Sequence, residues 1–232
     1  MSQGIFVTGT DTGSGKTEVA VALLQGLGRS GLRAVGYKPV ASGADPIDGI
    51  LQNDDALALQ RAGAPGVAYA DLNPYCFSPA IAPHLAAREA GVDIDADRIV
   101  AHYRRLAGQA DWVVVEGAGG WRVPLSDGFD MRALALALGV PVVLVVGLRL
   151  GCINHALLSE QSILDSGASL LGWIGSAVDP AMARPDDNIR SLRQVLAAPC
   201  LGILPRDRSE AAVDAVAARV QDAMRAQLES GL

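Results

Sequence analysis

Residues 9–17 read GTDTGSGKT, and they lie between an apolar run and a helical pattern. A phosphate-binding loop requires this context, because its backbone N–H groups converge on phosphate oxygens at the start of a helix. In such a loop Lys16 would reach the β and γ phosphates, and the Thr17 hydroxyl would ligate Mg²⁺. Five residues, rather than the usual four, separate Gly9 from Gly15. A glycine-rich turn without a ligand is therefore the alternative interpretation.

Short apolar runs alternate with helical patterns along the chain. The strands that we expect are residues 5–8, 34–38, 112–116, 142–146, 171–174 and 200–204. The helices that we expect are residues 17–29, 97–107, 131–138, 154–164 and 187–196, with a last one after Ser209. Residues 62–83 are rich in Gly, Pro and Asn and predict a long loop or lid. This order predicts an α/β fold with a doubly wound, mostly parallel sheet covered by helices on both faces, in one domain of residues 1–232.

The composition excludes several classes of function. Half of the residues are hydrophobic, the net charge is -6 and the isoelectric point is about 5.0, so the chain has no overall basic field for nucleic acid or an anionic membrane. The longest uncharged run, residues 133–148, is too short for a membrane span, and the first residues lack a secretory signal. Three widely spaced cysteines indicate neither a disulfide framework nor a zinc site. We therefore expect a soluble cytoplasmic protein.

The chain has only two lysines, Lys16 and Lys38, but seventeen arginines. Arginine serves equally well as solvated surface charge, so a lysine persists where a compact ammonium fits and a planar guanidinium does not. We therefore expect both lysines to be functional. Lys38 and Ser42 follow the second predicted strand, and the carboxyl ends of parallel strands face the ligand crevice. Both side chains are expected at the edge of the sheet that carries the phosphate-binding loop.

An acidic residue, Glu116, ends the third predicted strand and begins the sequence EGAGG at residues 116–120. At this edge Glu116 would hold Mg²⁺, directly or through water, and the glycines would let the backbone approach a ligand closely. A tight turn with a solvated Glu116 is the alternative. Asp54 and Asp55 begin a further helical stretch. There, either residue is a helix cap or a second carboxylate for the metal.

Four motifs, in the same order along the chain, resemble the dethiobiotin synthetase family. They are residues 8–17, GYKPVASG at 36–43, EGAGGW at 116–121 and GCINHA at 151–156. The resemblance extends to about residue 175 and continues more weakly to Pro205. It implies a P-loop fold and an ATP-dependent, Mg²⁺-requiring ligase of biotin biosynthesis. Such an enzyme closes the ureido ring of dethiobiotin from 7,8-diaminononanoate and CO₂.

The resemblance also implies roles for individual residues. Lys38 would stabilise a substrate carbamate and phosphoryl transfer, and Lys16 would hold the γ-phosphate. The metal ligands implied are Thr17, Asp55 and Glu116. The residues implied in nucleotide binding are Gly13, Ser14, Gly15, Lys16, Thr17, Glu18, Asp55, Glu116, Gly117, Ala118, Gly119, Ser176 and Pro205. Those implied in substrate binding are Ser42, Gly119, Cys152 and Asn154.

The family resemblance implies a homodimer as well. The helix expected after Gly151 begins with backbone N–H groups and a helix dipole that suit an anion. By resemblance, this helix start would bind the substrate carboxylate in the site of the neighbouring subunit. An ordinary helix start in a monomer is the alternative. Two residues depart from the family pattern: some relatives carry Glu at Gly13, and Ser176 stands where an Asn-Asp pair helps to recognise adenine in some relatives, so the base preference is open.

Two other classes of protein share parts of this pattern. Regulatory switch ATPases of the partitioning or septum-positioning type place a second Lys near the start of the phosphate-binding loop, where this chain has Thr10, Asp11 and Thr12. An amidotransferase-type ligase that acts on a corrinoid would be followed by a glutaminase domain, which we do not expect in these 232 residues. Both alternatives explain fewer of the residues than the ligase does.

Overall fold

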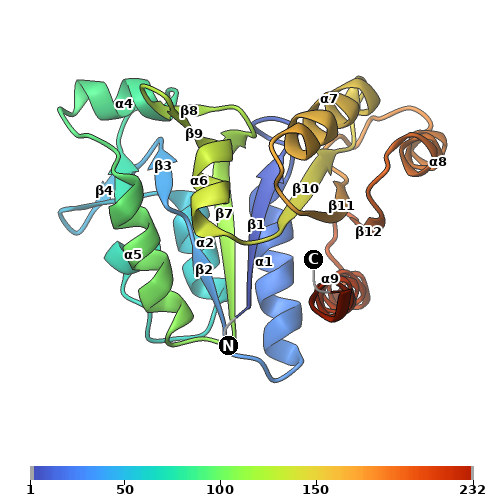
Figure 1. Ribbon diagram of the computed structural model, residues 1–232, viewed down its shortest axis with the longest axis horizontal. Coiled ribbons are helices and arrows are strands. Elements are labelled where there is room, and N and C mark those ends of the chain that lie inside the picture. The colour runs from blue at the N-terminus through green and yellow to red at the C-terminus, as the bar shows by residue number, and fades with distance from the viewer. Residues whose placement is uncertain (1–2, 231–232) are drawn as a thin grey trace.

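The computed structural model describes residues 3–230, and a sheet of six parallel strands forms its centre (Figure 1). In sheet order the strands are β12 (Cys200–Leu204), β11 (Leu170–Ser176), β10 (Val142–Gly147), β1 (Gln3–Gly9), β7 (Trp112–Gly120) and β2 (Ala34–Tyr37). Because β1 pairs with β10 on one side and with β7 on the other, the chain winds outward from the centre in both directions. The predicted strands all form, since their Val and Ile side chains are buried on both faces of the sheet.

Helices cover both faces of this sheet. One face carries α1 (Lys16–Arg29), α2 (Asp54–Ala62) and α9 (Glu210–Ser230). The other carries α5 (Ala96–Ala107), α6 (Met131–Leu138), α7 (Cys152–Asp165) and α8 (Pro185–Val195). The predicted helices are present with ends that differ by a residue or two, which is the usual uncertainty of helix boundaries. The prediction of a doubly wound α/β fold is therefore confirmed.

Two hydrophobic cores hold the sheet and helices together. In one, Leu23 and Leu27 of α1 pack with Val216 of α9. In the other, Ile99 of α5 and Leu134 of α6 pack on the opposite face of the sheet. Burial of an aliphatic side chain of this size contributes about 1.5–3 kcal/mol to stability. The two cores make the sheet a rigid support for the groups at its carboxyl edge.

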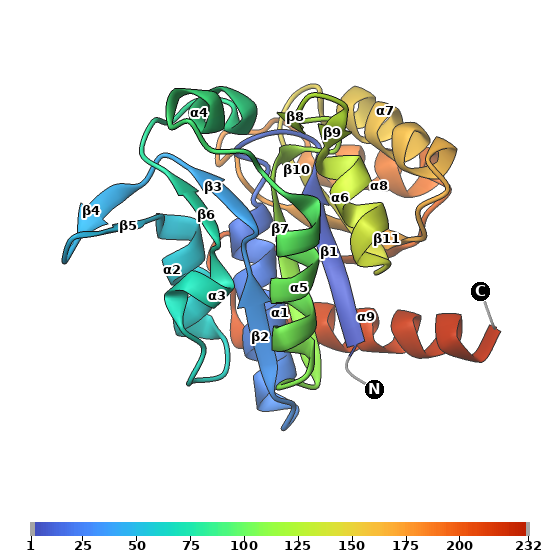
Figure 2. The same cartoon turned by 60° about the vertical axis from the view of Figure 1, so that its left-hand side comes forward.

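Smaller elements surround that edge. The short strands are β3 (Val40–Ser42), β4 (Asp45–Ile47), β5 (Ile50–Gln52), β6 (Tyr75–Phe77), β8 (Pro124–Ser126) and β9 (Phe129–Asp130). The short helices are α3 (Tyr69–Leu72) and α4 (Pro83–Glu89). β3 pairs with β6 in parallel, while β4–β5 and β8–β9 are antiparallel hairpins. The β4–β5 hairpin projects from the body of the molecule (Figure 2).

The structure corrects two expectations from the sequence. Residues 62–83 are not one long loop, because α3 and β6 form within them. The helical stretch at Asp54 is present, but neither Asp54 nor Asp55 caps it. Asn53 is the N-cap, and its side chain accepts hydrogen bonds from the N–H groups of Asp55 and Ala56. The carboxylate of Asp55 is therefore available for a different contact.

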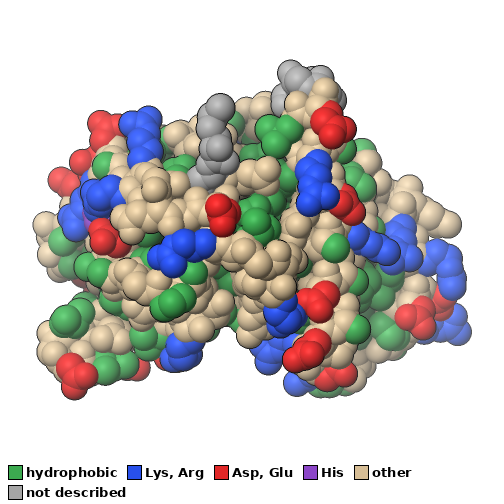
Figure 3. Space-filling model, turned by 90° about the horizontal axis from the view of Figure 1, so that it is seen from below, with side chains coloured by type: hydrophobic (Ala, Val, Ile, Leu, Met, Phe, Trp, Pro, Cys, Tyr) green, Lys and Arg blue, Asp and Glu red, His purple; other side chains and the backbone are tan. Residues whose placement is uncertain are grey.

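The face where the strands begin lies opposite the edge described above. Acidic and basic side chains are interspersed on it rather than separated into patches of one sign (Figure 3). Within residues 3–230, no helix is both long and apolar enough to cross a bilayer. These surface features direct attention to the carboxyl edge of the sheet.

Candidate active site

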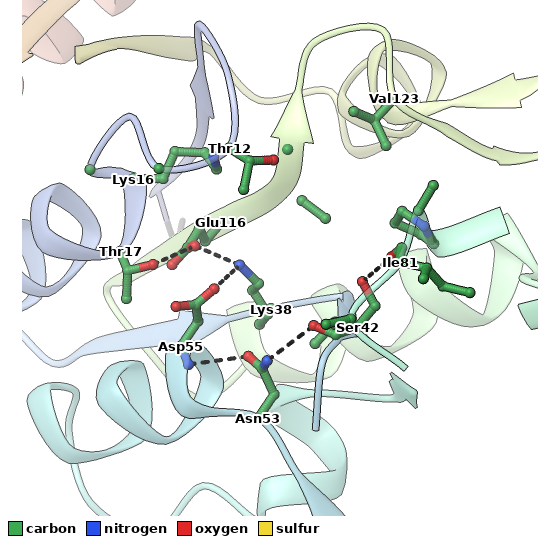
Figure 4. A pocket seen from close by; sticks show the side chains of 18 of the residues that line it. Thr12, Lys16, Thr17, Lys38, Ser42, Asn53, Asp55, Ile81, Glu116 and Val123 are labelled. Atoms are coloured by element: carbon green, nitrogen blue, oxygen red, sulfur yellow. Dashed lines mark hydrogen bonds and ion pairs between the residues drawn. The ribbon is translucent and has the colours of Figure 1, made fainter. Parts of the chain in front are cut away.

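A cavity of about 640 Å³ opens at the carboxyl edge of the sheet. It is bounded by the phosphate-binding loop, the segment after β2, the start of α2 and the segment before α4. Figure 4 shows Thr17, Lys38, Asp55 and Glu116 pointing toward one another from these separate elements. Thr17 and Glu116 form a hydrogen bond although they are 99 positions apart in the chain. The parallel sheet produces this convergence, because it brings the ends of its strands to one edge.

The phosphate-binding loop ends at Gly15, the N-cap of α1, which has a φ of 88°. A side chain is strained in this left-handed conformation, and a Cβ at Gly15 would also collide with Ser176 Oγ. The next residue, Lys16, is 7% exposed and donates from Nζ to the Asp11 carbonyl oxygen over 2.9 Å. Burial, together with the charge of Lys38, lowers the pKa of Lys16 to about 8. An anionic ligand would therefore stabilise the charged form of Lys16.

Lys38 is an almost fully buried charge, with 3% of its surface exposed. Its Nζ lies 3.0 Å from Asp55 Oδ2 and 2.5 Å from Glu116 Oε1. Burial alone would lower the pKa of Lys38, but the two carboxylates together outweigh it and raise that pKa. Burial also opposes ionisation of Asp55, yet Lys38 lowers the Asp55 pKa overall. Lys38 is therefore held as a fixed positive charge in the cavity.

The side chains around Lys38 offer the oxygen ligands that Mg²⁺ prefers. The Thr17 hydroxyl donates to Glu116 Oε1 over 2.9 Å. Glu116 is fully buried, which raises its pKa, and its Oε2 has no hydrogen-bond partner among residues 3–230. A buried carboxylate oxygen without a partner is costly, and a bound cation would satisfy it. Thr17, Asp55 and Glu116 therefore fit a magnesium ion.

A second cavity, of about 260 Å³, lies beside the phosphate-binding loop. Gly13, Gly15 and Glu18 border both cavities, so the two spaces meet at the loop. The other lining residues are Ser176, Ala177, Val178, Leu204, Pro205, Arg206 and Arg208. A ligand whose phosphates lie on the loop could place a second group in this smaller cavity.

Known proteins resemble this chain over nearly its whole length. A family model described as an AAA domain matches residues 3–212. The ATP-dependent dethiobiotin synthetase of Pseudomonas aeruginosa (strain UCBPP-PA14) is 54% identical over 216 residues, which are 93% of this chain and 94% of the relative. The chain belongs to the dethiobiotin synthetase family. A second synthetase of that name, from Aromatoleum aromaticum (strain DSM 19018 / LMG 30748 / EbN1), is 52% identical over 86% of this chain and 89% of its own length.

Solved structures share the fold at low sequence identity. The septum site-determining protein MinD of Pyrococcus horikoshii OT3, complexed with Mg-ADP, has a TM-score of 0.59 at 15% identity, over 95% of this chain and 96% of that chain. Cobyrinic acid a,c-diamide synthase of Mycobacterium smegmatis, with a bound ATP analog and magnesium, has a TM-score of 0.58 at 17% identity, over 100% and 98% of the two chains. These similarities show that this dethiobiotin synthetase family member has a P-loop fold.

Most residues predicted for the dethiobiotin synthetase site lie at the two cavities. Those that line the larger one are Gly13, Gly15, Lys16, Thr17, Glu18, Lys38, Ser42, Asp55, Glu116, Ala118 and Gly119. The smaller one is lined by Ser176 and Pro205, besides the loop residues. The sheet thus brings these residues together, while their individual roles stay predictions.

Four predicted residues of the synthetase site are placed differently. Ser14 is fully buried and lies outside the described linings of both cavities. A Cβ at Gly117 would lie 3.1 Å from the Phe6 ring, so packing against Phe6 favours a glycine at this position, and Gly117 lies outside the described linings of both cavities. Cys152 and Asn154 lie in the first turn of α7, outside the described linings of both cavities. A role for these two residues in substrate binding stays a prediction.

One wall of the larger cavity, formed by residues 80–83 with Asn53, was not predicted from the sequence. The Ser42 hydroxyl donates to the Ile81 carbonyl oxygen over 2.7 Å and thereby joins this wall to β3. Pro83 could have indicated the start of α4 from the sequence, since proline favours the first position of a helix. Asn53 could likewise have indicated the start of α2, because Asn directly before a helical stretch is a preferred N-cap.

Proposed function

We propose that the protein closes the ureido ring of dethiobiotin from 7,8-diaminononanoate and CO₂, with ATP as co-substrate and Mg²⁺ as cofactor, in biotin biosynthesis. Membership of the dethiobiotin synthetase family supports this activity. The observation that carries it is the convergence of Lys16 and Lys38 in one cavity with the carboxylates of Asp55 and Glu116. This arrangement combines a phosphate-binding loop with a buried cation beside it.

The reaction proceeds in three steps that need positive charge at one place. One substrate amine attacks CO₂ and loses a proton, which gives an anionic carbamate. A carbamate oxygen then attacks the γ-phosphorus of ATP, and the bond to ADP breaks. Lys38 stabilises the carbamate and the transferring phosphoryl group, while Lys16 holds the γ-phosphate. The second amine finally attacks the carbonyl carbon of the phosphorylated carbamate and loses a proton, phosphate leaves and the ring closes.

The remaining residues of the two cavities bind and orient the reactants. Ser42 and Gly119 contact the diamine substrate from the wall of the larger cavity. Thr17, Asp55 and Glu116 would hold Mg²⁺, which would supply positive charge to the triphosphate. The nucleotide base occupies the smaller cavity, where the residues that line it include Ser176 and Pro205.

A homodimer supplies the end of the site that binds the substrate carboxylate. Cys152 and Asn154 lie at the N-terminus of α7, where backbone N–H groups and the helix dipole favour an anion. Asn154 is exposed, and so are two leucines nearby, Leu150 at 95% and Leu158 at 64%. An apolar surface beside an exposed helix start suits a subunit contact.

One assay tests the proposed activity against the alternative of a switch ATPase. Phosphate release and dethiobiotin formation are measured with ATP and Mg²⁺, with diaminononanoate and bicarbonate supplied together and one at a time. We expect both products only when the two substrates are present together, in equal amounts. Phosphate release that ignores the diamine, without dethiobiotin, would contradict the proposal and favour the switch ATPase.

A further inference from the structure

A polar network lies behind the larger cavity and joins the two elements that carry Lys38 and Asp55. Lys38 follows β2, whereas Asp55 lies in the first turn of α2. Their contact of 3.0 Å therefore depends on how the backbones of these two elements are held relative to each other. The hydroxyl of Tyr69, in α3, lies between the two elements.

The Tyr69 hydroxyl makes two short hydrogen bonds whose directions are determined by its partners, besides a longer contact of 3.7 Å with Cys76 Sγ. It accepts from the Asn53 backbone N–H over 2.8 Å and donates to Asn73 Oδ1 over 2.9 Å. A backbone N–H can only donate and an amide oxygen can only accept, so the hydroxyl must play both roles. Burial raises the pKa of Tyr69, so the hydroxyl keeps the proton that it donates.

One branch of the network leads to the backbone of Lys38. Asn73 Nδ2 donates to the Lys38 carbonyl oxygen over 2.6 Å. The Lys38 N–H in turn donates to the Leu72 carbonyl oxygen over 2.9 Å. Both backbone polar groups of Lys38 are thus held by the segment that starts at Tyr69. Asn73 is itself buried, so its amide group is fixed in orientation by these contacts.

The other branch leads to Asp55 through the start of α2. Asn53, whose N–H is bound by Tyr69, caps this helix by accepting from the N–H groups of Asp55 and Ala56. Asn53 Nδ2 also donates to the Gly43 carbonyl oxygen over 3.0 Å. The bond from Asn53 to Asp55 is visible in Figure 4. The position of the Asp55 backbone therefore depends on the residue that Tyr69 anchors.

We propose that Tyr69 is a positioning residue that sets the placement of Lys38 relative to Asp55 and so the geometry of the reaction centre. Its effect on catalysis rests on the function proposed above. Tyr69 does not line the larger cavity as described for residues 3–230, so it acts through Asn53 and Asn73 rather than on the reactants. A displacement of about 1 Å between reacting groups can lower a rate by about 100-fold. Loss of the Tyr69 hydroxyl can therefore lower the catalytic rate although Tyr69 does not contact the reactants.

The chain offers a closely matched control in Tyr75. Its hydroxyl accepts from the backbone N–H of Asp95 over 2.9 Å, and Asp95 is the N-cap of α5. Tyr69 and Tyr75 therefore each anchor the N-cap residue of a helix through the same kind of bond. The helix anchored by Tyr69 carries Asp55, whereas α5 contributes no residue to the described lining of the larger cavity. Tyr→Phe removes one such hydroxyl in either case.

The first test compares Tyr69→Phe with Tyr75→Phe in the full chain. We expect kcat to fall by about tenfold in Tyr69→Phe and by less than about twofold in Tyr75→Phe, with nucleotide affinity within about twofold of wild type in both. A kcat for Tyr69→Phe within that twofold range would overturn the proposal. So would an equal loss of kcat in both variants, because it would reflect general destabilisation.

The second test does not depend on catalysis. Amide hydrogen exchange at Asp55 and Ala56 should be about tenfold faster in Tyr69→Phe than in wild type, and unchanged in Tyr75→Phe, because the cap residue Asn53 loses its anchor. Unchanged exchange at these amides would overturn the positioning role. If the wild-type protein made no dethiobiotin, the proposed function would fail, and the exchange comparison would still decide whether Tyr69 positions the start of α2.

Discussion

The two halves of the carboxyl edge differ in how far one chain completes them. Beside β2 and β7, Lys38 is enclosed and paired with Asp55 and Glu116, and their backbones are tied together through Tyr69. Beside β10, Asn154 in the first turn of α7 is exposed and Leu150 is 95% exposed. Buried charges are costly unless they are paired, so the first half must be finished within the chain. The second half carries no such constraint, and we propose that a partner subunit completes it.

The largest loss of turnover is expected when Lys38, in the enclosed half of the site, is replaced. Lys38→Arg should lower turnover by about 10²- to 10³-fold, which is roughly 3–4 kcal/mol of transition-state stabilisation, because the larger planar cation does not fit between the carboxylates and the reacting groups. Nucleotide affinity should stay within about twofold, since Lys16 and the loop backbone remain. Steady-state kinetics and calorimetric titration with nucleotide measure both. Near-wild-type turnover would remove Lys38 from the mechanism.

A smaller effect, on nucleotide affinity, is expected from the titration of Lys16, whose pKa is lowered whereas that of Lys38 is raised. Lys16 bonds to a backbone carbonyl, and its pKa in the protein without nucleotide is about 8. Phosphates bind the ammonium form, so affinity is complete below this pKa and is lost as the pH rises through it. Nucleotide affinity should therefore be about tenfold weaker one pH unit above this pKa than well below it.

Calorimetric titration between about pH 7 and about pH 9.5 measures this dependence on Lys16. Lys16→Gln provides the control, because its side chain does not titrate in this range and its weaker affinity should not vary with pH. A flat profile in the wild-type protein would contradict the prediction. It would mean that Lys16 keeps its charge throughout and is as firmly held as Lys38.

The smallest expected effect is a partial recovery of activity on mixing two inactive variants. It tests whether a second subunit completes the open half of the site. Lys16→Ala disables the phosphate-binding loop, and Asn154→Asp places a negative charge where the substrate carboxylate is proposed to bind. Random reassociation of the two inactive variants puts half of the protein in mixed dimers with one intact site each, and so restores about one quarter of wild-type activity if sites are shared. Each variant alone is the control. Mixed dimers without activity would show that each site is built within one chain.

Much of the fold and of the enclosed half could be predicted from local patterns. The strand runs, the loop at residues 9–17 and the position of Lys38 directly after a strand could be predicted, because parallel strands bring their carboxyl ends to one edge. Glu116 was expected at the end of its strand, but β7 continues through it to Gly120. The dethiobiotin synthetase resemblance rested on the same segments. Its family assignment is confirmed by relatives of 54% and 52% identity.

Other features were decided by contacts between distant segments. The cap of α2 is Asn53 rather than Asp54 or Asp55, a shift of one or two positions that local propensity does not resolve. The buried side chain of Ser14 and the packing of Gly117 against Phe6 depend on neighbours from other elements.

The sequence by itself determined which chemical groups reach the carboxyl edge, since the order of strands, glycines, lysines and carboxylates is local information. The tertiary structure alone decided how these groups are held. Tyr69 lies in a stretch that the sequence predicted as a loop, yet its hydroxyl joins Asn53 to Asn73 and thereby α2 to the backbone of Lys38. A hydroxyl can accept one bond and donate another only where packing brings both partners within reach, and no local periodicity encodes that meeting.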